Sequence, residues 1–274
     1  MASLPAPGRI APGRIAPARL SGRRAALMVE RNTMALGSSW MMVLGGFFEQ
    51  LFYLLSIGFG LGGMVGDVPG PDGRPIAYAL FVAPALLASS SMNGAITECT
   101  FNFFFKLTYQ KTYDAVLSTP MAPGDVALGE IGWAIIRSTL YSVGFFAVLL
   151  VLGLYRSPLA ILAIPAAMLL SWAFSAVALA LTTWMRGWQD FDLIFLVTLP
   201  LFLFSGTFYP ITAYPEALRV LVEWSPLYQG VVLIRGLITG VVDAGALAHV
   251  AYLVAMGFLG LAVVSRRLDR LLRK

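Results

Sequence analysis

The sequence predicts an all-α polytopic membrane protein, and three observations support this fold class. Of the 274 residues, 58% are hydrophobic and only 12% are charged. A soluble domain carries about 25% charged residues, so this chain lacks the polar surface that water would require. Apolar runs of about 20 residues recur along it, which is the length of a helix that crosses a bilayer. The chain therefore predicts one membrane domain, with no room for a separate soluble catalytic domain.

Residues 1–24 are predicted to form a flexible basic arm, and residues 25–274 the single membrane domain. The arm contains the duplication APGRIAPGRIAPARL, whose repeated Pro and Gly disfavour regular structure. Its arginines would lie on anionic headgroups. It lacks the apolar stretch of about 7–15 residues that a secretory signal requires. Residues 25–36 then predict a short N-terminal interfacial helix.

Six transmembrane helices are predicted, because backbone groups in lipid must satisfy one another within a helix. We expect them at residues 39–63, 77–99, 126–153, 158–183, 191–209 and 245–265. Pro84, Pro165 and Pro200 lie within the second, fourth and fifth of these spans and are candidate kink sites.

A polar interruption at residues 101–132 separates the second and third spans. The apolar runs on both sides mean that it must leave the membrane and re-enter it. We predict a short helix over residues 109–117 at the cytoplasmic surface, where a soluble partner can push on it. Composition alone leaves an ordinary solvated loop equally open. The residues of this candidate coupling helix are Tyr109, Gln110, Lys111, Thr112, Tyr113 and Asp114.

The distribution of basic residues predicts that both termini are cytoplasmic. With the N-terminus inside, 14 of the 19 Lys and Arg residues lie on the cytoplasmic side. The outer side holds four: Arg74, Arg156, Arg219 and Arg235. Lys and Arg accumulate in cytoplasmic loops, so this excess fixes the orientation. Because the basic residues flank apolar segments, they indicate orientation in a bilayer and not nucleic-acid binding.

The last external segment, residues 210–244, contains apolar pieces too short to cross a membrane. Pro210, Pro215 and Pro226 interrupt it. We predict one or two re-entrant helices here, before the last span. Such backbone is stable at membrane depth only when it is buried in protein or lines a wet cavity.

The residues needed for most catalytic and metal sites are missing from the sequence. Cys99 is the only cysteine and His249 the only histidine, so neither a histidine–cysteine metal site nor a serine–histidine triad can be assembled. No GxxxxGK[ST] motif occurs, so the chain is not expected to bind ATP. We expect no cofactor on this chain and no enzymatic activity of its own. ATP and Mg²⁺ would belong to a partner.

Four charged residues near or within the spans form a candidate polar network or cargo path: Glu49, Glu98, Glu130 and Arg137. A charge at mid-bilayer costs about 2.5–3.5 kcal/mol, so it normally faces protein or water. Glu49 and Arg137 lie about 14 Å and about 16 Å into their spans at 1.5 Å per residue. We therefore expect these two to face each other, within or between protomers. Glu130 and Arg137 are seven residues apart and share a helix face. A structural ion-pair network and direct contact with cargo both remain open.

Three blocks of sequence resemble the permease subunits of type-2 ATP-binding-cassette (ABC) exporters. They are residues 49–63 (EQLFYLLSIGFGLGG), residues 97–132 with TYDAVLSTPMAPGDVALGEI at their centre, and residues 204–236 (FSGTFYPITAYPEALRVLVEWSPLYQGVVLIRG). The resemblance covers about residues 25–268 and is strongest to nodulation-factor (lipo-oligosaccharide) and daunorubicin-resistance-type export permeases. It implies a six-span permease that is homodimeric or paired with a second permease. It also implies two cytoplasmic ATPase subunits, a coupling helix at about 109–117 and re-entrant helices at about 211–240.

The favoured function is the permease subunit of an ATP-driven exporter in a bacterial cytoplasmic membrane. By resemblance, its cargo would be lipid-linked molecules, glycolipids or amphipathic drug-like molecules. An ATP-independent secondary transporter or channel is the alternative, disfavoured because no inverted repeat is evident between the halves of the chain. A lipid-modifying membrane transferase is a third possibility, for which Glu98 and Glu130 are the only candidate carboxylates.

Overall fold

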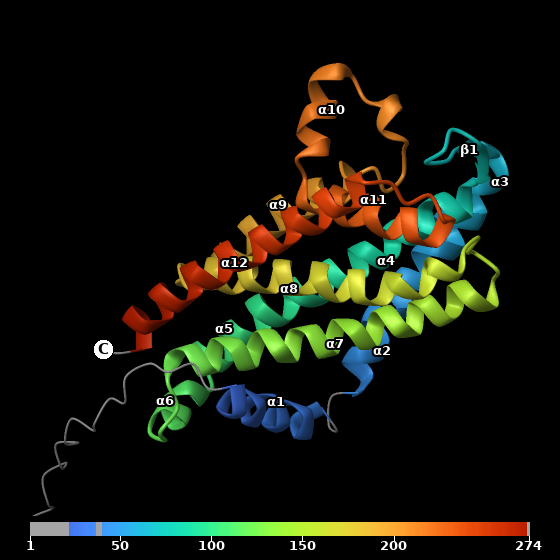
Figure 1. Ribbon diagram of the computed structural model, residues 1–274. Helices are drawn as coiled ribbons and strands as arrows, with labels where there is room; N and C mark the ends of the chain where they lie inside the picture. The colour runs from blue at the N-terminus through green and yellow to red at the C-terminus, as the bar shows by residue number, and fades with distance from the viewer. Residues whose placement is uncertain (1–21, 37–39, 273–274) are drawn as a thin grey trace, which may run out of the picture.

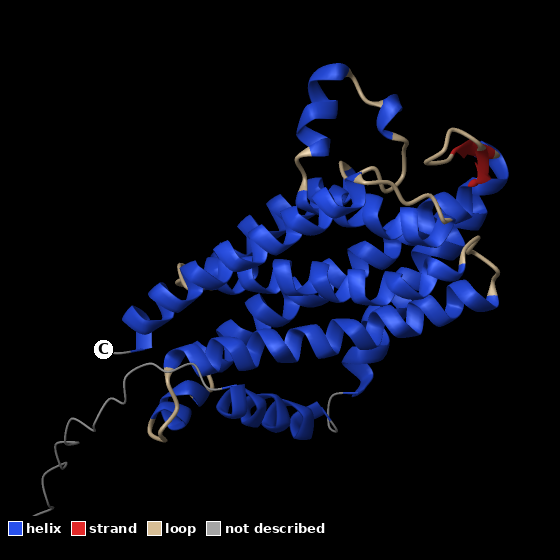
Figure 2. Cartoon of the chain, in the orientation of Figure 1, coloured by secondary structure: helices blue, strands red, loops and turns tan. Residues whose placement is uncertain are grey.

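The computed structural model describes residues 22–36 and 40–272. Nearly all of this part of the chain is helical, which confirms the all-α membrane fold (Figure 2). The predicted N-terminal arm lies almost wholly outside the described residues. The helices run obliquely past one another in one bundle, with α6 (Thr112–Leu117) and α10 (Glu216–Glu223) at opposite ends (Figure 1). We refer to these as the α6 end and the α10 end.

Five helical segments among the described residues are long and apolar enough to cross a membrane. They are Gly45–Val65, Tyr78–Thr108, Pro123–Val151, Pro158–Thr182 and Gly245–Leu268. They correspond to predicted spans one, two, three, four and six. The elements that compose them are α2 (Trp40–Tyr53), a π-helical segment (Leu54–Leu61), α3 (Gly62–Val65), α4 (Tyr78–Thr97), a second π-helical segment (Glu98–Asn102), α5 (Phe103–Thr108), α7 (Pro123–Val151), a 3-10 turn (Pro158–Leu162), α8 (Ala163–Thr182) and α12 (Gly245–Leu272).

The centre of the bundle is α4, which is buried around its whole circumference over residues 78–92. A helix that is apolar on all sides belongs in such a position. It packs against α7, α8 and α11 (Pro226–Thr239), and α12 packs along α8. Glycines permit the α8–α12 contact: a Cβ on Gly260 would lie 2.8 Å from the backbone nitrogen of Val177. The helix axes therefore approach more closely than larger side chains would allow.

The predicted fifth span, residues 191–209, is wrong in its length. A 3-10 turn (Trp188–Asp190) leads into α9 (Phe191–Leu203), which has only 13 residues. At 1.5 Å per residue it is about 20 Å long, against about 30 Å of hydrocarbon. The backbone leaves the helical region at Phe204 (φ −105°, ψ 36°), and Gly206 then adopts φ +65°, a conformation that favours glycine. Hydropathy could not reveal this break, since the apolar residues continue beyond it.

The segment before the last span forms two helices, within the region where re-entrant helices are predicted. A short 3-10 turn (Ile211–Ala213) precedes α10, and α10 and α11 meet at an angle of 80°. By length and composition this bent pair is either a re-entrant loop or one broken span. Arg235 on α11 is 7% exposed, and it donates hydrogen bonds to the carbonyls of Phe81 and Gly206 at 3.2 and 2.7 Å. The buried arginine thus ties α11 to α4 and to the break after α9.

A β-hairpin lies at one end of the bundle and the N-terminal helix α1 at the other (Figure 1). A small antiparallel hairpin of β1 (Asp67–Pro69) and β2 (Pro75–Ala77), which we did not predict, follows the first span. At the other end, α1 (Gly22–Leu36) packs along α7, with Met28 buried against Gly129. The predicted helix is therefore present, and its position at the membrane surface stays a prediction.

Candidate functional site

The candidate site begins where α4 continues past the predicted end of its span. The helix runs on through the π-helical segment Glu98–Asn102 and α5 to Thr108, nine residues beyond the predicted end at residue 99. Glu98, Asn102 and Lys106 follow at intervals of four residues, so they share a face. Asn102 Nδ2 donates a hydrogen bond of 2.7 Å to Glu98 Oε2. The extension carries Lys106, expected in a loop, into the bundle.

Four charged residues on this extension and on α7 form a cluster that we call the ionic cluster: Glu98, Lys106, Glu130 and Arg137. Lys106 Nζ lies 2.7 Å from Glu130 Oε2 and 3.7 Å from Glu98 Oε1. The other carboxylate oxygen of Glu98 is paired with Arg137 Nη1. Glu98 and Glu130 are 3% and 1% exposed. Lys106 thus bridges the two buried carboxylates of Glu98 and Glu130, and Arg137 pairs with Glu98.

Helix α1 completes the cluster from outside the spans. Arg31 Nη2 lies 4.0 Å from Glu130 Oε1, and Asn32 Oδ1 accepts a hydrogen bond of 3.3 Å from Lys106 Nζ. A second contact joins the start of α1 to the start of α7, where Arg24 Nη1 lies 3.8 Å from Asp125 Oδ2. The same carboxylate oxygen accepts the backbone N–H of Ala122 at 3.1 Å. The helix α1 therefore contacts α7 through two ion pairs, one at Arg24 near its start and one at Arg31 in its second half.

The cluster joins three elements and has little solvent to screen its charges. With Arg31 included, it contains two carboxylates and three cations. Removing charges from water costs several kcal/mol each, and pairs repay this cost only with good geometry and additional hydrogen bonds. Such bonds are present: Arg137 Nε donates to Tyr141 Oη at 3.0 Å, and Asn102 and Asn32 bind the other members. The arrangement defines one relative position of α1, α5 and α7.

The helix α6 contacts the bundle beside the ionic cluster through Tyr113. Its side chain is fully buried, with its ring 5.0 Å from the ring of Phe103 on α5. Burial, and then the negative charge of Glu130, raise the pKa of the Tyr113 phenol well above its usual value. The hydroxyl is buried near the Glu130 carboxylate, which contributes to the raised pKa. A displacement of α6 must therefore move α5 or α7, because the tyrosine fills the space between them.

The predicted coupling helix begins three residues later than expected. The sequence prediction placed it over residues 109–117, but α6 spans Thr112–Leu117. Lys111 adopts a left-handed conformation with φ 49°, which prevents Tyr109 and Gln110 from joining the helix. Tyr109 instead stacks on Trp188, with ring centroids 5.8 Å apart.

The six predicted coupling residues divide into one buried anchor and an accessible surface. Tyr109, Gln110, Lys111 and Asp114 are exposed, Thr112 is half-buried, and Tyr113 is buried. The turn of chain at the α6 end therefore presents polar side chains to solvent on one side. On the other side it inserts an aromatic ring into the bundle. This combination suits a surface on which a soluble partner binds.

The expected pairing of Glu49 with Arg137 within the chain is wrong. Arg137 binds Glu98, which lies on the neighbouring helix at the same level. Glu49 is exposed on α2 and makes no hydrogen bond or ion pair with any described residue. The two residues also lie at different levels along the bundle, because Phe47 packs against Gly144 and Glu49 therefore lies beyond Arg137 along α7. The sequence also does not show which face of α2 points into the bundle. Gln50, the next residue, is the buried one, at 2% exposure.

Sequence reasoning missed Lys106, Arg31 and Asn32 as members of the site. The spacing of Glu98, Asn102 and Lys106 was an available signal, because it aligns three polar side chains on one helical face. The aromatic run FNFFF between them is also better suited to a helix in the bundle than to a solvated loop. Nothing in the sequence places α1 against α7. Among the described residues, no three His, Cys, Asp or Glu side chains gather where they could hold a metal.

Comparison with known proteins places the chain among membrane transport proteins. The family described as ABC-2 type transporter matches residues 24–239. Nodulation protein J of Rhizobium leguminosarum bv. trifolii is 33% identical over 83% of this chain and 87% of the relative. The same protein from R. leguminosarum bv. viciae is 31% identical over 83% and 88%, and that from Rhizobium meliloti is 30% identical over 82% and 86%. The matched residues contain the ionic cluster, α6 and the α10–α11 pair.

Proposed function

Because the chain belongs to the ABC-2 type transporter family and is a multi-pass membrane permease of an ABC exporter, we propose that it works as a passive gate driven by separate ATPase subunits. The proposed cargo is lipid-linked, glycolipid or otherwise amphipathic, as the resemblance to lipo-oligosaccharide export permeases implies. The proposed location is a bacterial cytoplasmic membrane. ATP and Mg²⁺ would bind the ATPase subunits.

One observation carries the coupling proposal: α6 combines an exposed polar face with a fully buried tyrosine beside the ionic cluster. In this proposal two ATPase subunits bind the exposed face and draw together when they bind ATP. Tyr113 transmits the displacement of α6 to α5 and α7. The ATPase can shift the permease between states only through its different affinity for each state. The ionic cluster supports this role by holding α1, α5 and α7 as one unit.

The exposed charge on α2 supports pairing of two permease copies. Glu49 would lie against hydrocarbon in an isolated chain, and a charge at mid-bilayer costs about 2.5–3.5 kcal/mol. Its neighbours on the same helix, Phe48 and Phe52, are 42% and 63% exposed. We therefore place this face of α2 toward a second permease or a water-filled path between copies. A homodimer is the simplest such assembly.

The coupling proposal is tested by reversing the charge of Asp114, which is exposed on α6. Asp114→Arg should weaken retention of the ATPase partner at least about fivefold, equivalent to about 1 kcal/mol, because it changes the proposed contact surface. Retention is measured by affinity purification in mild detergent. Glu216→Arg is the matched control, since the same charge reversal on exposed α10 lies at the opposite end of the bundle.

Two outcomes would contradict the proposal. If Asp114→Arg and Glu216→Arg retained the partner equally, α6 would not be the binding surface. If the purified chain alone transported an amphipathic substrate in liposomes with an ion gradient and no ATPase, the ATP-independent alternative would replace the exporter.

A further inference from the structure

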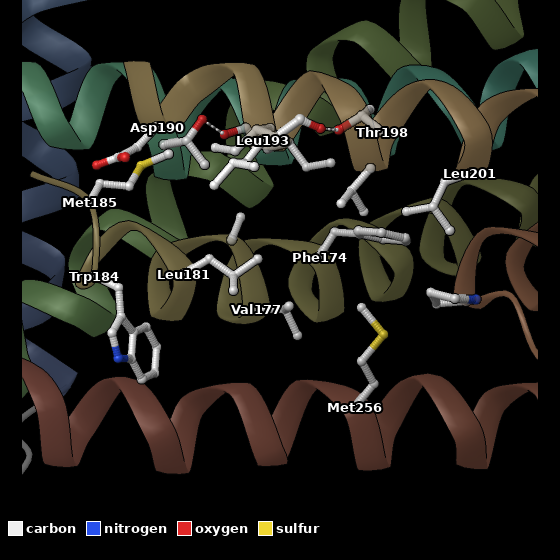
Figure 3. Close-up of a pocket in the computed structure, with 16 residues that line it drawn as sticks. Phe174, Val177, Leu181, Trp184, Met185, Asp190, Leu193, Thr198, Leu201 and Met256 are labelled. Atoms are coloured by element: carbon white, nitrogen blue, oxygen red, sulfur yellow. Dashed lines mark hydrogen bonds between the residues drawn. The ribbon is translucent and has the colours of Figure 1, made fainter. Parts of the chain in front are cut away.

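A lateral cavity of about 640 Å³ lies between α8, α9 and α12, and no member of the ionic cluster lines it. Phe174, Val177 and Leu181 project from α8 into the space between α9 and α12 (Figure 3). The rest of the lining is also mostly apolar, and it comes mainly from α9, from Ile96 and Thr100 on α4 and its continuation, from Pro226 and from Met256 on α12. The volume falls within the range of about 300–1,000 Å³ that is typical of small-ligand sites.

The cavity opens sideways, on the surface that would face hydrocarbon. On α9, Leu193 and Val197 line it and are 61% and 58% exposed. On α8, Leu181 is 53% exposed. Water would not fill an apolar space at this depth, whereas the surrounding lipid has direct access to it. A helix with its side chains is about 10–12 Å across, so a flexible chain fits this volume better than a helix does.

The end of the cavity nearest α6 carries positive charge. Trp184 lines this end, and the guanidinium of Arg267 lies 4.2 Å from the centroid of its ring. Arg186, two residues after Trp184 in the chain, is exposed, and neither arginine forms a salt bridge with a described residue. Asp190 is the one acidic residue in the lining. Its carboxylate already accepts the backbone N–H groups of Arg186 and Gly187 at 2.6 and 3.2 Å.

We propose that this cavity binds an anionic phospholipid of the leaflet at the α6 end, with an acyl chain between α8, α9 and α12 and the phosphate beside Arg267 and Arg186. The apolar lining matches the acyl chain. The two guanidinium groups, which form no salt bridge with a described residue, match the headgroup in charge. Tryptophan at the boundary between the two parts is typical of the membrane interface. The proposal does not depend on the exporter function.

The headgroup contact is tested on the purified full-length chain after delipidation. Native mass spectrometry measures binding of dioleoyl phosphatidylglycerol and dioleoyl phosphatidylcholine. The unmodified chain should bind phosphatidylglycerol more tightly. Arg267→Gln should reduce that preference about fivefold, the usual contribution of one basic residue at an anionic membrane surface. Arg266→Gln is the matched control, because its neighbouring exposed side chain does not stack on Trp184, and Arg267→Lys should retain the preference.

The acyl contact is tested separately on α9, so that a folding defect in one variant does not decide the result. Val197→Trp fills the cavity and should reduce binding of both lipids at least about fivefold. Leu196→Trp, at an equally exposed neighbour outside the lining, should leave binding unchanged. Equal effects of the two tryptophans would overturn the proposal, as would equal effects of Arg267→Gln and Arg266→Gln. Full competition by glycerol 3-phosphate would also overturn it, because the acyl chain would then contribute nothing.

Discussion

At the scale of single residues, the ionic cluster depends on Lys106, which among the described cations alone bridges both buried carboxylates. Its Nζ lies 2.7 Å from Glu130 and 3.7 Å from Glu98, and its side chain is 16% exposed. Breaking a buried pair leaves an uncompensated charge, which is far more costly than never having formed the pair. Substitutions that remove one member of the cluster should therefore destabilise the chain strongly, even if the net contribution of the intact cluster to stability is small.

We predict that Lys106→Met destabilises the folded chain by about 3–5 kcal/mol. The loss should appear as a lower Tm or a lower denaturant midpoint for the chain in detergent. Lys111→Met removes the same charge from an exposed position only five residues away, and it should change stability by less than about 0.5 kcal/mol. If both variants melted like the unmodified chain, the described ion pairs would be energetically unimportant.

The buried phenol of Tyr113 predicts a pH dependence. In the unfolded chain a tyrosine ionises near pH 10, whereas in the folded chain the pKa is raised. Above about pH 10 the unfolded state therefore binds fewer protons than the folded state, and stability falls as pH rises. Tyr113→Phe should lose less stability between pH 7.5 and pH 10.5 than the unmodified chain.

At neutral pH, Tyr113→Phe should cost less than about 1.5 kcal/mol, because the ring still packs on Phe103 and only the hydroxyl near Glu130 is lost. Tyr113→Ala should instead cost about 3–5 kcal/mol, since it leaves a large cavity beside Phe103. Denaturant titrations at the two pH values measure both effects. If Tyr113→Phe were as strongly destabilised at pH 7.5 as Tyr113→Ala, this prediction would be wrong, because the hydroxyl would then contribute as much to stability as the ring does.

At the scale of elements, the sequence predicted helices well but misjudged where several of them end. Hydropathy located α7, α8 and α12 because each is a long apolar run flanked by polar or breaking residues. It missed the ends of α5, α6 and α9, which depend on single residues. Lys111 and Gly206 adopt positive φ, and the aromatic residues before Lys106 keep α5 in the bundle. Backbone breaks of this kind carry no hydropathy signal.

The contact between α8 and α12 gives a prediction for a single methyl group. A Cβ on Gly260 would lie 2.8 Å from backbone atoms of Ala176 and Val177, which cannot move without separating the helices. Gly260→Ala should therefore destabilise the chain by about 1–3 kcal/mol, measured by thermal unfolding in detergent. Gly63→Ala is the control, because a Cβ there meets nothing within 4 Å. Equal melting of the two variants would contradict the close packing.

At the scale of the whole molecule, the orientation in the membrane follows from the distribution of Lys and Arg and can be tested by labelling. We predict that Ser118→Cys, just after α6, reacts with a membrane-impermeant maleimide only from the cytoplasmic side. Asp72→Cys, in the hairpin at the other end, should react only from outside. The native Cys99 is fully buried and should give little background. Labelling of Ser118→Cys from outside would reverse the proposed topology and remove α6 from the reach of an ATPase.

The candidate site was only partly predictable from the sequence, for a physical reason. Intramembrane charge identified Glu98, Glu130 and Arg137 as important, because such residues are costly in lipid. Which charges pair depends on the rotation of each helix about its axis and on its shift along the bundle. Glu49 is exposed while Gln50 is buried, and Phe47 packs against Gly144, well beyond Arg137. The contribution of α1 depends on tertiary packing at Gly129, where the small residue admits Met28. Neither property can be read from composition.

The shortness of α9 has a consequence for the surrounding bilayer. A helix of about 20 Å beside neighbours long enough to cross the full hydrocarbon creates hydrophobic mismatch on one flank of the protein. Lipids there would thin locally unless a second permease copy covers this flank, and the thinning costs a fraction of a kcal/mol for each ångström of mismatch. The protein would therefore sense membrane thickness on this flank, so that shorter acyl chains in the host membrane favour its folded state.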